Sequence, residues 1–96
     1  MHKDRTMTHT LKCRSDFFND IWRLQKTFEL RRDDRNFQVG DWVLLREIKI
    51  GIGYTGRKIN ARIRYVLRNA EEFGLQPGHC IFGMELIQNF RGIAWK

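Results

Sequence analysis

Residues 58–68 alternate between apolar and mostly basic side chains, and this pattern predicts one long β-strand. The apolar positions are Ile59, Ala61, Ile63, Tyr65 and Leu67, and the polar positions are Lys58, Asn60, Arg62, Arg64 and Arg68. Val66 is the one exception. Because successive side chains of a strand point to opposite faces, the segment has a core face and a basic face. A sheet is therefore the central element of the expected fold.

Shorter segments of the chain predict one helix and four further strands. Ser15 can cap a helix that ends near Gln25 and carries the apolar stripe Phe17, Phe18, Ile21, Trp22 and Leu24. Strands are predicted over residues 9–14, 27–31, 42–47 and 80–87, with Phe28 and Leu30 on the buried face of the second. Trp22 and Trp42 follow core periodicity.

The order strand, helix and then four strands is unlike the regular alternation of a doubly wound sheet. We therefore expect an α+β, mainly β fold. It consists of a small curved sheet or partly closed β-barrel with the N-terminal amphipathic helix packed at its end.

A single domain is expected, because 96 residues can form one modest core but not two. Residues 1–8 are predicted to be a flexible arm, residues 9–87 the domain, and residues 88–96 a tail packed on the domain or on a partner. The longest apolar run, Trp42–Leu45, is far below the roughly 20 residues of a membrane span. The polar segment Met1–Arg5 has no apolar stretch behind it, so we expect no secretory signal. We therefore expect a cytoplasmic protein without membrane contact.

Neither the cysteines nor the histidines predict a metal site or a cofactor. Cys13 and Cys80 form no CxxC motif, and His2, His9 and His79 are scattered. Reduced thiols are the default for an intracellular protein, although the sequence leaves a single Cys13–Cys80 bridge open.

The charge of the chain favours an acidic partner. Eighteen Lys and Arg against eleven Asp and Glu leave a net charge of +7. RNA, DNA and an anionic protein surface all fit this excess. On the long strand, neighbouring basic side chains lie about 7 Å apart, so they can follow a phosphate backbone. The residues of this basic stripe are Lys58, Arg62, Arg64 and Arg68; the alternative is a solvated outer strand face.

The segment Lys26–Arg31 could carry chemistry. On a strand, Thr27, Glu29 and Arg31 project to one side, and Lys26 lies at the junction with the helix. Such a cluster can bind a phosphate and a base edge, or supply a base and a cation for hydrolysis. A solvated network of ion pairs is the structural alternative.

A glycine-rich loop carries Tyr54 beside Thr55 and Arg57. A loop aromatic next to an arginine suits base stacking with phosphate contact, or else Tyr54 caps the barrel. Asp34, Arg35 and Asp41 fit turn-stabilising roles, although Arg35 could also reach a ligand. The role of His9 stays open.

These segments together resemble a phage and bacterial family of uncharacterised domains in the ASCH group of the PUA-like superfamily. The resemblance covers roughly residues 9–87. Lys26, Glu29 and Arg31 match the last three defined positions of its Gly-x-Lys-x-x-Glu-x-Arg motif, and Leu24 replaces the glycine. The other matching segments are His9-Thr10-Leu11-Lys12, Asp34-Arg35-x-Phe37, Gly40-Asp41, Tyr54-Thr55-Gly56-Arg57 and residues 74–82.

The resemblance implies a PUA-like barrel whose motif lines a cleft between helix and sheet, in a module that binds RNA. Some relatives hydrolyse acylated nucleosides with the motif Lys, a Thr and a Glu. That Thr aligns with Glu29 here, and Thr27 lies two positions away, so the hydrolase residues do not carry over one by one.

Three functions follow. The first is RNA or nucleotide binding without catalysis, in a cleft lined by Lys12, Lys26, Glu29, Arg31, Tyr54 and Arg57. The second is an amidohydrolase for an acylated nucleoside, with Lys26, Glu29 and Thr27 at its centre. The third is a phage-encoded inhibitor that binds a host protein through the basic face and the Phe90 and Trp95 tail.

Overall fold

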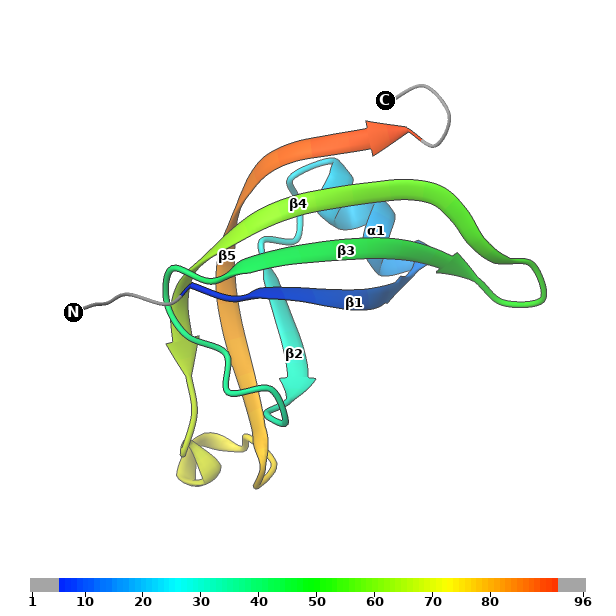
Figure 1. Ribbon diagram of the computed structural model, residues 1–96. Coiled ribbons are helices and arrows are strands. Elements are labelled where there is room, and N and C mark those ends of the chain that lie inside the picture. Colours follow the sequence, from blue (N-terminus) through cyan, green and yellow to red (C-terminus); the bar gives the residue numbers. More distant parts are fainter. Residues whose placement is uncertain (1–5, 92–96) are drawn as a thin grey trace.

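Five strands and one α-helix follow the predicted order in the computed structural model, which describes the backbone of residues 6–91 and the side chains of residues 6–87 (Figure 1). A short 3-10 helix, η1 (Glu71–Phe73), joins the last two strands. The elements are β1 (Thr8–Arg14), α1 (Ser15–Trp22), β2 (Phe28–Arg32), β3 (Trp42–Lys49), β4 (Gly53–Leu67) and β5 (His79–Arg91).

The strands form one curved sheet in the order β1-β3-β4-β5-β2, which confirms the predicted mainly β, partly closed architecture. β1 and β3 are parallel, and every other neighbouring pair is antiparallel. The long strands β4 and β5 curve strongly, so that β2 comes to lie behind β1 in the view of Figure 1. Their register shifts at two irregularities, and such bulges bend a strand.

The two edge strands, β1 and β2, face each other without a backbone ladder. Arg31 Nη2 on β2 donates to the Lys12 carbonyl at 2.6 Å. Arg35, in the loop after β2, donates to the Thr10 carbonyl at 3.1 Å. We call this junction between β1 and β2 the seam. Side chains bridge the seam, so the barrel is half closed.

The hydrophobic core fills the concave side of the sheet under α1. Phe18 and Ile21 of the helix are buried, and the middle of β3 and β4 supplies the floor. The buried apolar cluster consists of Leu11, Cys13, Phe18, Ile21, Phe37, Val43, Leu45, Ile59, Ala61, Ile63, Cys80, Phe82 and Met84.

The alternation predicted for β4 holds only as far as Ile63. A register shift between Ile63 and Tyr65 inserts one extra residue and reverses the phase of the side chains that follow. Val66 therefore packs on the core, whereas Tyr65 is 62% exposed. The prediction that Tyr65 lies on the core face is wrong for this reason.

Trp22 and Trp42 differ in position. Trp22 is partly buried against the core, as predicted. Trp42 lies on the opposite face of β3 from buried Val43, with the Arg62 guanidinium 4.7 Å from its ring. The prediction that Trp42 belongs to the core is therefore wrong, because the first residue of β3 points away from the core.

A buried carboxylate, Glu47, joins the helix to the sheet. Its side chain is 2% exposed and faces α1 from β3. Ser15 of the helix and Thr55 of β4 each donate a hydroxyl hydrogen bond of 2.6 Å to it. Arg57 of β4 donates from Nε at 2.8 Å and from Nη2 at 2.9 Å. The predicted helix cap of Ser15 is wrong, since its hydroxyl is used by Glu47.

Arg57 also connects this carboxylate to the helix surface. Its Nη2 donates to Asn19 Oδ1 at 2.6 Å, and its guanidinium lies 5.0 Å from the ring of Phe18 and 4.9 Å from the ring of Trp22. These contacts hold one face of α1 against β3 and β4.

Asp41 holds the turn before β3, as its sequence position predicted. It accepts the backbone N–H of Gln38 at 3.1 Å, and that of Met7 at 3.2 Å. His9 Nε2 lies 2.8 Å from its Oδ2, and both side chains are buried. His9 is therefore an interior partner of Asp41.

The helix ends three residues before the predicted Gln25, in a Schellman motif. Leu24 N–H donates to the Ile21 carbonyl at 2.9 Å, and Gln25 N–H to the Asp20 carbonyl at 2.8 Å. Leu24 takes the left-handed conformation, with φ of 64°, that this motif requires and that glycine adopts most readily. The glycine of the family motif would stand at this position.

The folded domain extends beyond its predicted bounds, residues 9–87, at both ends. Thr8 already belongs to β1, and β5 continues through residues 88–91 beside β4. Residues 1–5 and 92–96, and the side chain of Phe90, lie outside the described part of the chain, as do the predicted arm before residue 6 and Trp95. In residues 6–91, no helix is long and apolar enough to cross a membrane.

We predict that Leu24→Gly stabilises the protein by about 1 kcal/mol, because glycine carries no Cβ penalty in the left-handed region. Urea unfolding measures the change. Leu24→Ala is the matched control: it removes the same exposed side chain but keeps the Cβ, and it should bring no such gain. A loss of stability in the glycine variant would contradict the interpretation.

We predict that Glu47→Gln destabilises the protein by roughly 3–5 kcal/mol at neutral pH, because it leaves the Arg57 guanidinium without its charge partner. Glu85→Gln, which breaks an exposed pair with Arg64, should cost less than about 1 kcal/mol. Equal losses in the two variants would contradict the role given to Glu47.

Acid unfolding tests the same carboxylate. The hydrogen bonds from Arg57, Ser15 and Thr55 lower the pKa of Glu47 from 4.5 to about 2. Its stabilising contribution is therefore complete above pH 4.5 and is lost as the pH falls toward 2. The stability of Glu47→Gln should fall less steeply than that of the wild type in this window. Identical slopes would show that Glu47 does not titrate with unfolding.

Candidate functional site

A cleft of about 640 Å³ opens at the seam between β1 and β2. β1, the start of α1, β2 and the first residue of β5 contribute its walls. The lining residues are Lys12, Cys13, Arg14, Phe17, Lys26, Phe28, Glu29, Leu30, Arg31, Arg32 and His79. The cleft therefore brings together Lys12, Lys26, Glu29 and Arg31, four of the six residues predicted to bind a ligand.

The floor of the cleft centres on the Glu29 carboxylate, which is 5% exposed as a residue. Lys26 Nζ lies 3.7 Å from its Oε1, and Arg31 Nε lies 3.4 Å from the same oxygen. Cys13 Sγ lies 3.7 Å from its Oε2. Two cations thus compensate one buried anion, while part of the carboxylate still faces the cavity.

The orientation of β2 is the reverse of the prediction. Glu29 and Arg31 point to the inner side, whereas Phe28 is 46% and Leu30 57% exposed. The reason is the open seam. On this edge strand the inner side meets a polar, solvent-accessible cleft, so charged residues can be placed there without being fully desolvated.

Cys13 contributes a thiol to the floor that sequence reasoning did not select. Burial, and then the negative charge of Glu29, raise the pKa of Cys13 to about 12. The thiol is therefore neutral at physiological pH and is no nucleophile. Cys13 and Cys80 are both free and buried, so the bridge that the sequence left open is not formed.

The rim of the cleft is strongly basic. Five Lys and Arg side chains and one carboxylate line the cleft, which leaves a net charge of +4 with His79 neutral. Arg14 forms an exposed ion pair with Asp16 at 2.7 Å. Within residues 6–87, Lys12 and Arg32 show no ion pair. These two cations are available to an anionic ligand.

Two partly exposed aromatic rings stand on either side of Lys26. Its ammonium lies 5.2 Å from the Phe17 ring and 4.9 Å from the Phe28 ring, and it donates to the Phe28 carbonyl at 2.8 Å. The Arg14 guanidinium lies 4.8 Å from the Phe17 ring. Aromatic faces and cations thus alternate around the mouth of the cleft.

Thr27 does not join the cleft. It lines a separate small cavity with Lys26 and apolar residues of α1, β4 and β5. Lys26 borders both cavities, but Glu29 lines only the cleft and Thr27 only the small cavity. The three residues predicted for hydrolysis therefore do not meet in one cavity.

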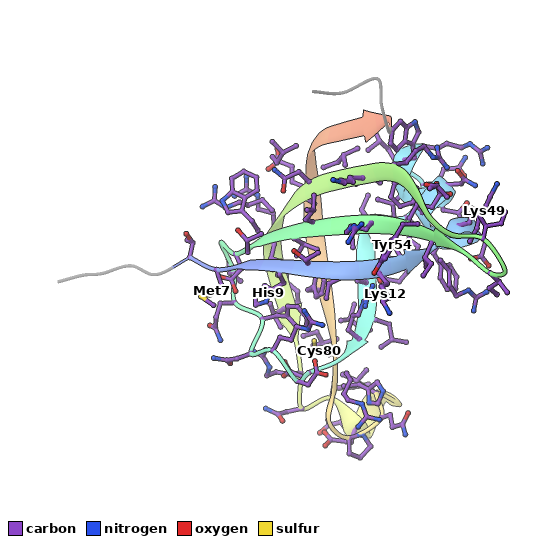
Figure 2. All side chains as sticks on the ribbon, turned by 45° about the vertical axis from the view of Figure 1, so that its right-hand side comes forward. Met7, His9, Lys12, Lys49, Tyr54 and Cys80 are labelled. Atoms are coloured by element: carbon purple, nitrogen blue, oxygen red, sulfur yellow. The ribbon has the colours of Figure 1, made fainter. Side chains whose placement is uncertain are left out.

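Tyr54 and Arg57 lie outside the cleft as well. Arg57 is committed to Glu47, and the Arg46 guanidinium covers the Tyr54 ring at 3.8 Å. Figure 2 shows Tyr54 beside Lys49 at the β3–β4 hairpin, whereas His9 and Met7 mark the other end of β1. The placement of Tyr54 and Arg57 in the ligand cleft is therefore wrong. The sequence signal that could have revealed the true partner of Arg57 is Glu47, a carboxylate at a core-facing position of the apolar strand β3.

The predicted basic stripe is used largely within the protein. Arg62 Nε donates to the Gly40 carbonyl at 2.6 Å, Arg64 pairs with Glu85, and Arg68 Nε bonds Asp33 Oδ2 at 2.6 Å. Lys58 is half-buried. The bulge in β4 also breaks the regular spacing of these side chains. The geometry therefore does not favour a continuous row of phosphate contacts along β4.

No cluster of three or more His, Cys, Asp or Glu suited to a metal ion occurs in the part of the chain that the structure describes. Asp34 and Arg35 lie 4.0 Å apart at the exposed end of the seam, where Arg35 bonds the backbone of β1.

Comparisons with known proteins place the cleft within a matched region. A family model described as a domain of unknown function (DUF3850) matches residues 8–84. An uncharacterized 12.9 kDa protein in the GpA 3' region of Escherichia phage P2 is 38% identical over 55 residues. The match covers 57% of this chain and 50% of the phage protein, so the chain spans about half the length of that relative.

We predict that neither thiol of the native protein reacts with iodoacetamide at about pH 8, because both are buried and burial raises both pKa values. Both should react after unfolding in urea, which is the control for reagent activity. Mass spectrometry counts the modified cysteines. Rapid labelling of native Cys13 would contradict the burial and the raised pKa of this thiol.

Proposed function

The chain belongs to the DUF3850 family of domains of unknown function, and from the geometry of its cleft we propose that it binds RNA or a nucleotide at the seam. The observation that carries the proposal is the combination found in one cavity. Cations without ion-pair partners and exposed aromatic rings surround a buried carboxylate. Each of these groups suits a different part of a nucleotide.

Phosphate is the part that the rim would hold. Lys12 and Arg32 lie on facing strands, so an anion between them is contacted from both sides of the seam. A guanidinium and an ammonium both form charge-assisted hydrogen bonds with phosphate oxygens. Their shared charge also attracts a polyanion from a distance.

The base is the part that the floor and the aromatic rings would hold. Phe17 and Phe28 present ring faces at the mouth, where a base can stack. The Glu29 carboxylate accepts hydrogen bonds only, so it would bind the exocyclic amino group of adenine, cytosine or guanine. Lys26 and Arg31 lie beside the carboxylate and orient it for this contact.

The resemblance of residues 9–87 to the ASCH group of the PUA-like superfamily supports the same ligand class. In that group the Lys, Glu and Arg of the motif line a cleft. Here Lys26, Glu29 and Arg31 do so as well, beside a helix on a half-closed sheet.

Hydrolysis of an acylated nucleoside is the second candidate, and one contact favours it. The Lys26 ammonium lies 3.7 Å from the Glu29 carboxylate inside the cavity, a pairing that could move a proton. The position of Thr27 outside the cleft is against it, since no hydroxyl nucleophile lines the cavity among residues 6–87. Binding without catalysis is therefore preferred.

We predict that Lys26→Met and Glu29→Gln each weaken binding of a short single-stranded RNA by about tenfold. Lys26→Met removes a cation from the cleft, and Glu29→Gln replaces the carboxylate acceptor with a weaker amide acceptor. Fluorescence anisotropy across a salt series measures the affinity, with an RNA hairpin and matched DNA for comparison. Lys49→Met is the matched control, because it removes the same charge from the exposed end of β3.

The control separates recognition in the cleft from general attraction. Equal weakening by Lys26→Met and Lys49→Met would reduce the binding to nonspecific phosphate attraction. Absence of binding to every nucleic acid and nucleotide at moderate salt would overturn the proposal. The basic face would then fit an anionic protein surface of a phage host better.

A further inference from the structure

Gly83, in the interior of β5, separates two exposed aromatic residues on the outer face of the sheet. It pairs with Phe28 of β2 on one side and with Tyr65 of β4 on the other. Directly opposite residues of antiparallel strands project from the same face, so the three residues form one row across the sheet. Phe28 is 46% and Tyr65 62% exposed, which identifies this face as the outer one.

The backbone does not require glycine in this position. The φ of Gly83 is not among the positive values found at the turn glycines. A Cβ built on Gly83 would lie 3.8 Å from the Tyr65 Cβ, which is an ordinary contact. Glycine weakens the interior of a strand and often marks a place where another group approaches the backbone closely. The missing side chain leaves an open slot between the two rings.

The width of the slot matches one planar ring. Strands two positions apart in a sheet are separated by about 9.5 Å. Aromatic rings in contact have centroids roughly 4.5–7 Å apart, so a single ring placed over Gly83 can contact both neighbours. An amino-acid aromatic ring and a nucleic-acid base are the two planar groups of this size.

The surroundings of the slot favour the base. Phe28 also borders the cleft, and the Lys26 ammonium lies 4.9 Å from its ring. Arg32, which shows no ion pair within residues 6–87, follows Phe28 on the same face of β2, whereas Arg64 before Tyr65 is paired with Glu85. Cations beside stacking rings are typical of surfaces that bind single-stranded nucleic acid. The slot is continuous with the cleft through Phe28, so one strand can occupy both.

We propose that the slot formed by Phe28, Gly83 and Tyr65 holds an unstacked base of single-stranded nucleic acid, next to the nucleotide bound in the cleft. This inference rests on the proposed function and extends it, because it identifies the ligand as a strand and not a free nucleotide. The bound nucleic-acid strand crosses the edge strand β2, with one nucleotide in the cleft and the next in the slot.

Two variants test the slot from opposite directions. Tyr65→Ala removes one wall, and Gly83→Val fills the space with a residue that suits a strand. The control Phe73→Ala removes an exposed aromatic ring from η1, outside the row. The probes are a labelled adenylate oligonucleotide of about ten residues and adenosine monophosphate, each titrated against all variants.

We expect Tyr65→Ala and Gly83→Val to weaken oligonucleotide binding about tenfold and to leave binding of adenosine monophosphate unchanged. Phe73→Ala should bind both probes as the wild type does. Gly83→Val should keep or raise the melting temperature, since a β-branched residue replaces an interior glycine. Reduced binding without reduced stability would show that the glycine serves the ligand and not the fold.

The outcomes distinguish this inference from the function on which it rests. Wild-type oligonucleotide affinity in Tyr65→Ala and Gly83→Val, together with loss in Lys26→Met, would overturn the slot and keep the cleft. Equal loss of mononucleotide binding in the slot variants would also overturn it, because the base would then belong to the cleft. Failure of the wild type to bind either probe would overturn both, whereas binding of adenosine monophosphate alone would overturn the slot and keep the cleft.

Discussion

The buried carboxylate of Glu47 determines how the helix sits on the sheet. A charge removed from water is tolerated only when hydrogen bonds and an opposite charge compensate it, and here α1 and β4 supply both. The Arg57 guanidinium that neutralises it also packs on the rings of Phe18 and Trp22. The position of α1 in turn places Phe17, at its first turn, beside the cleft. The candidate site therefore depends on an ion pair that it does not contain.

The open seam explains why a polar cleft exists in so small a barrel. An edge strand has unpaired backbone groups that need partners. Arg31 and Arg35 satisfy two carbonyls of β1 with their side chains, which holds the edges near each other without joining them. A full ladder would close the barrel and exclude water from Glu29. The half-closed state instead leaves a cavity with a buried anion at its floor and cations at its rim. Both proposed binding surfaces meet at β2, the strand that forms one edge of the seam.

Much of the fold could be predicted from local patterns, and the errors have specific causes. The apolar stripe of α1 and the alternation of β4 identified these elements, and the spacing of Lys26, Glu29 and Arg31 correctly indicated that they converge. Period-two alternation shows which residues share a face, but not which face is inside, so β2 was predicted in reverse. The bulge before Tyr65 has no local signature, because it is formed against β5. Arg57 was assigned to a ligand because its buried partner lies on another strand.

The amino-acid sequence by itself determined the elements, their order, the basic character of the protein and the clustering of Lys26, Glu29 and Arg31, since these follow from interactions between near neighbours in the chain. Only the tertiary structure decided that Cys13 lies at the floor of the cleft, that Glu47 pairs with Arg57, and that Phe28 and Tyr65 flank Gly83. Each of these arrangements depends on the register between strands far apart in the sequence. Register is set by the packing of the whole sheet, which a local pattern does not contain.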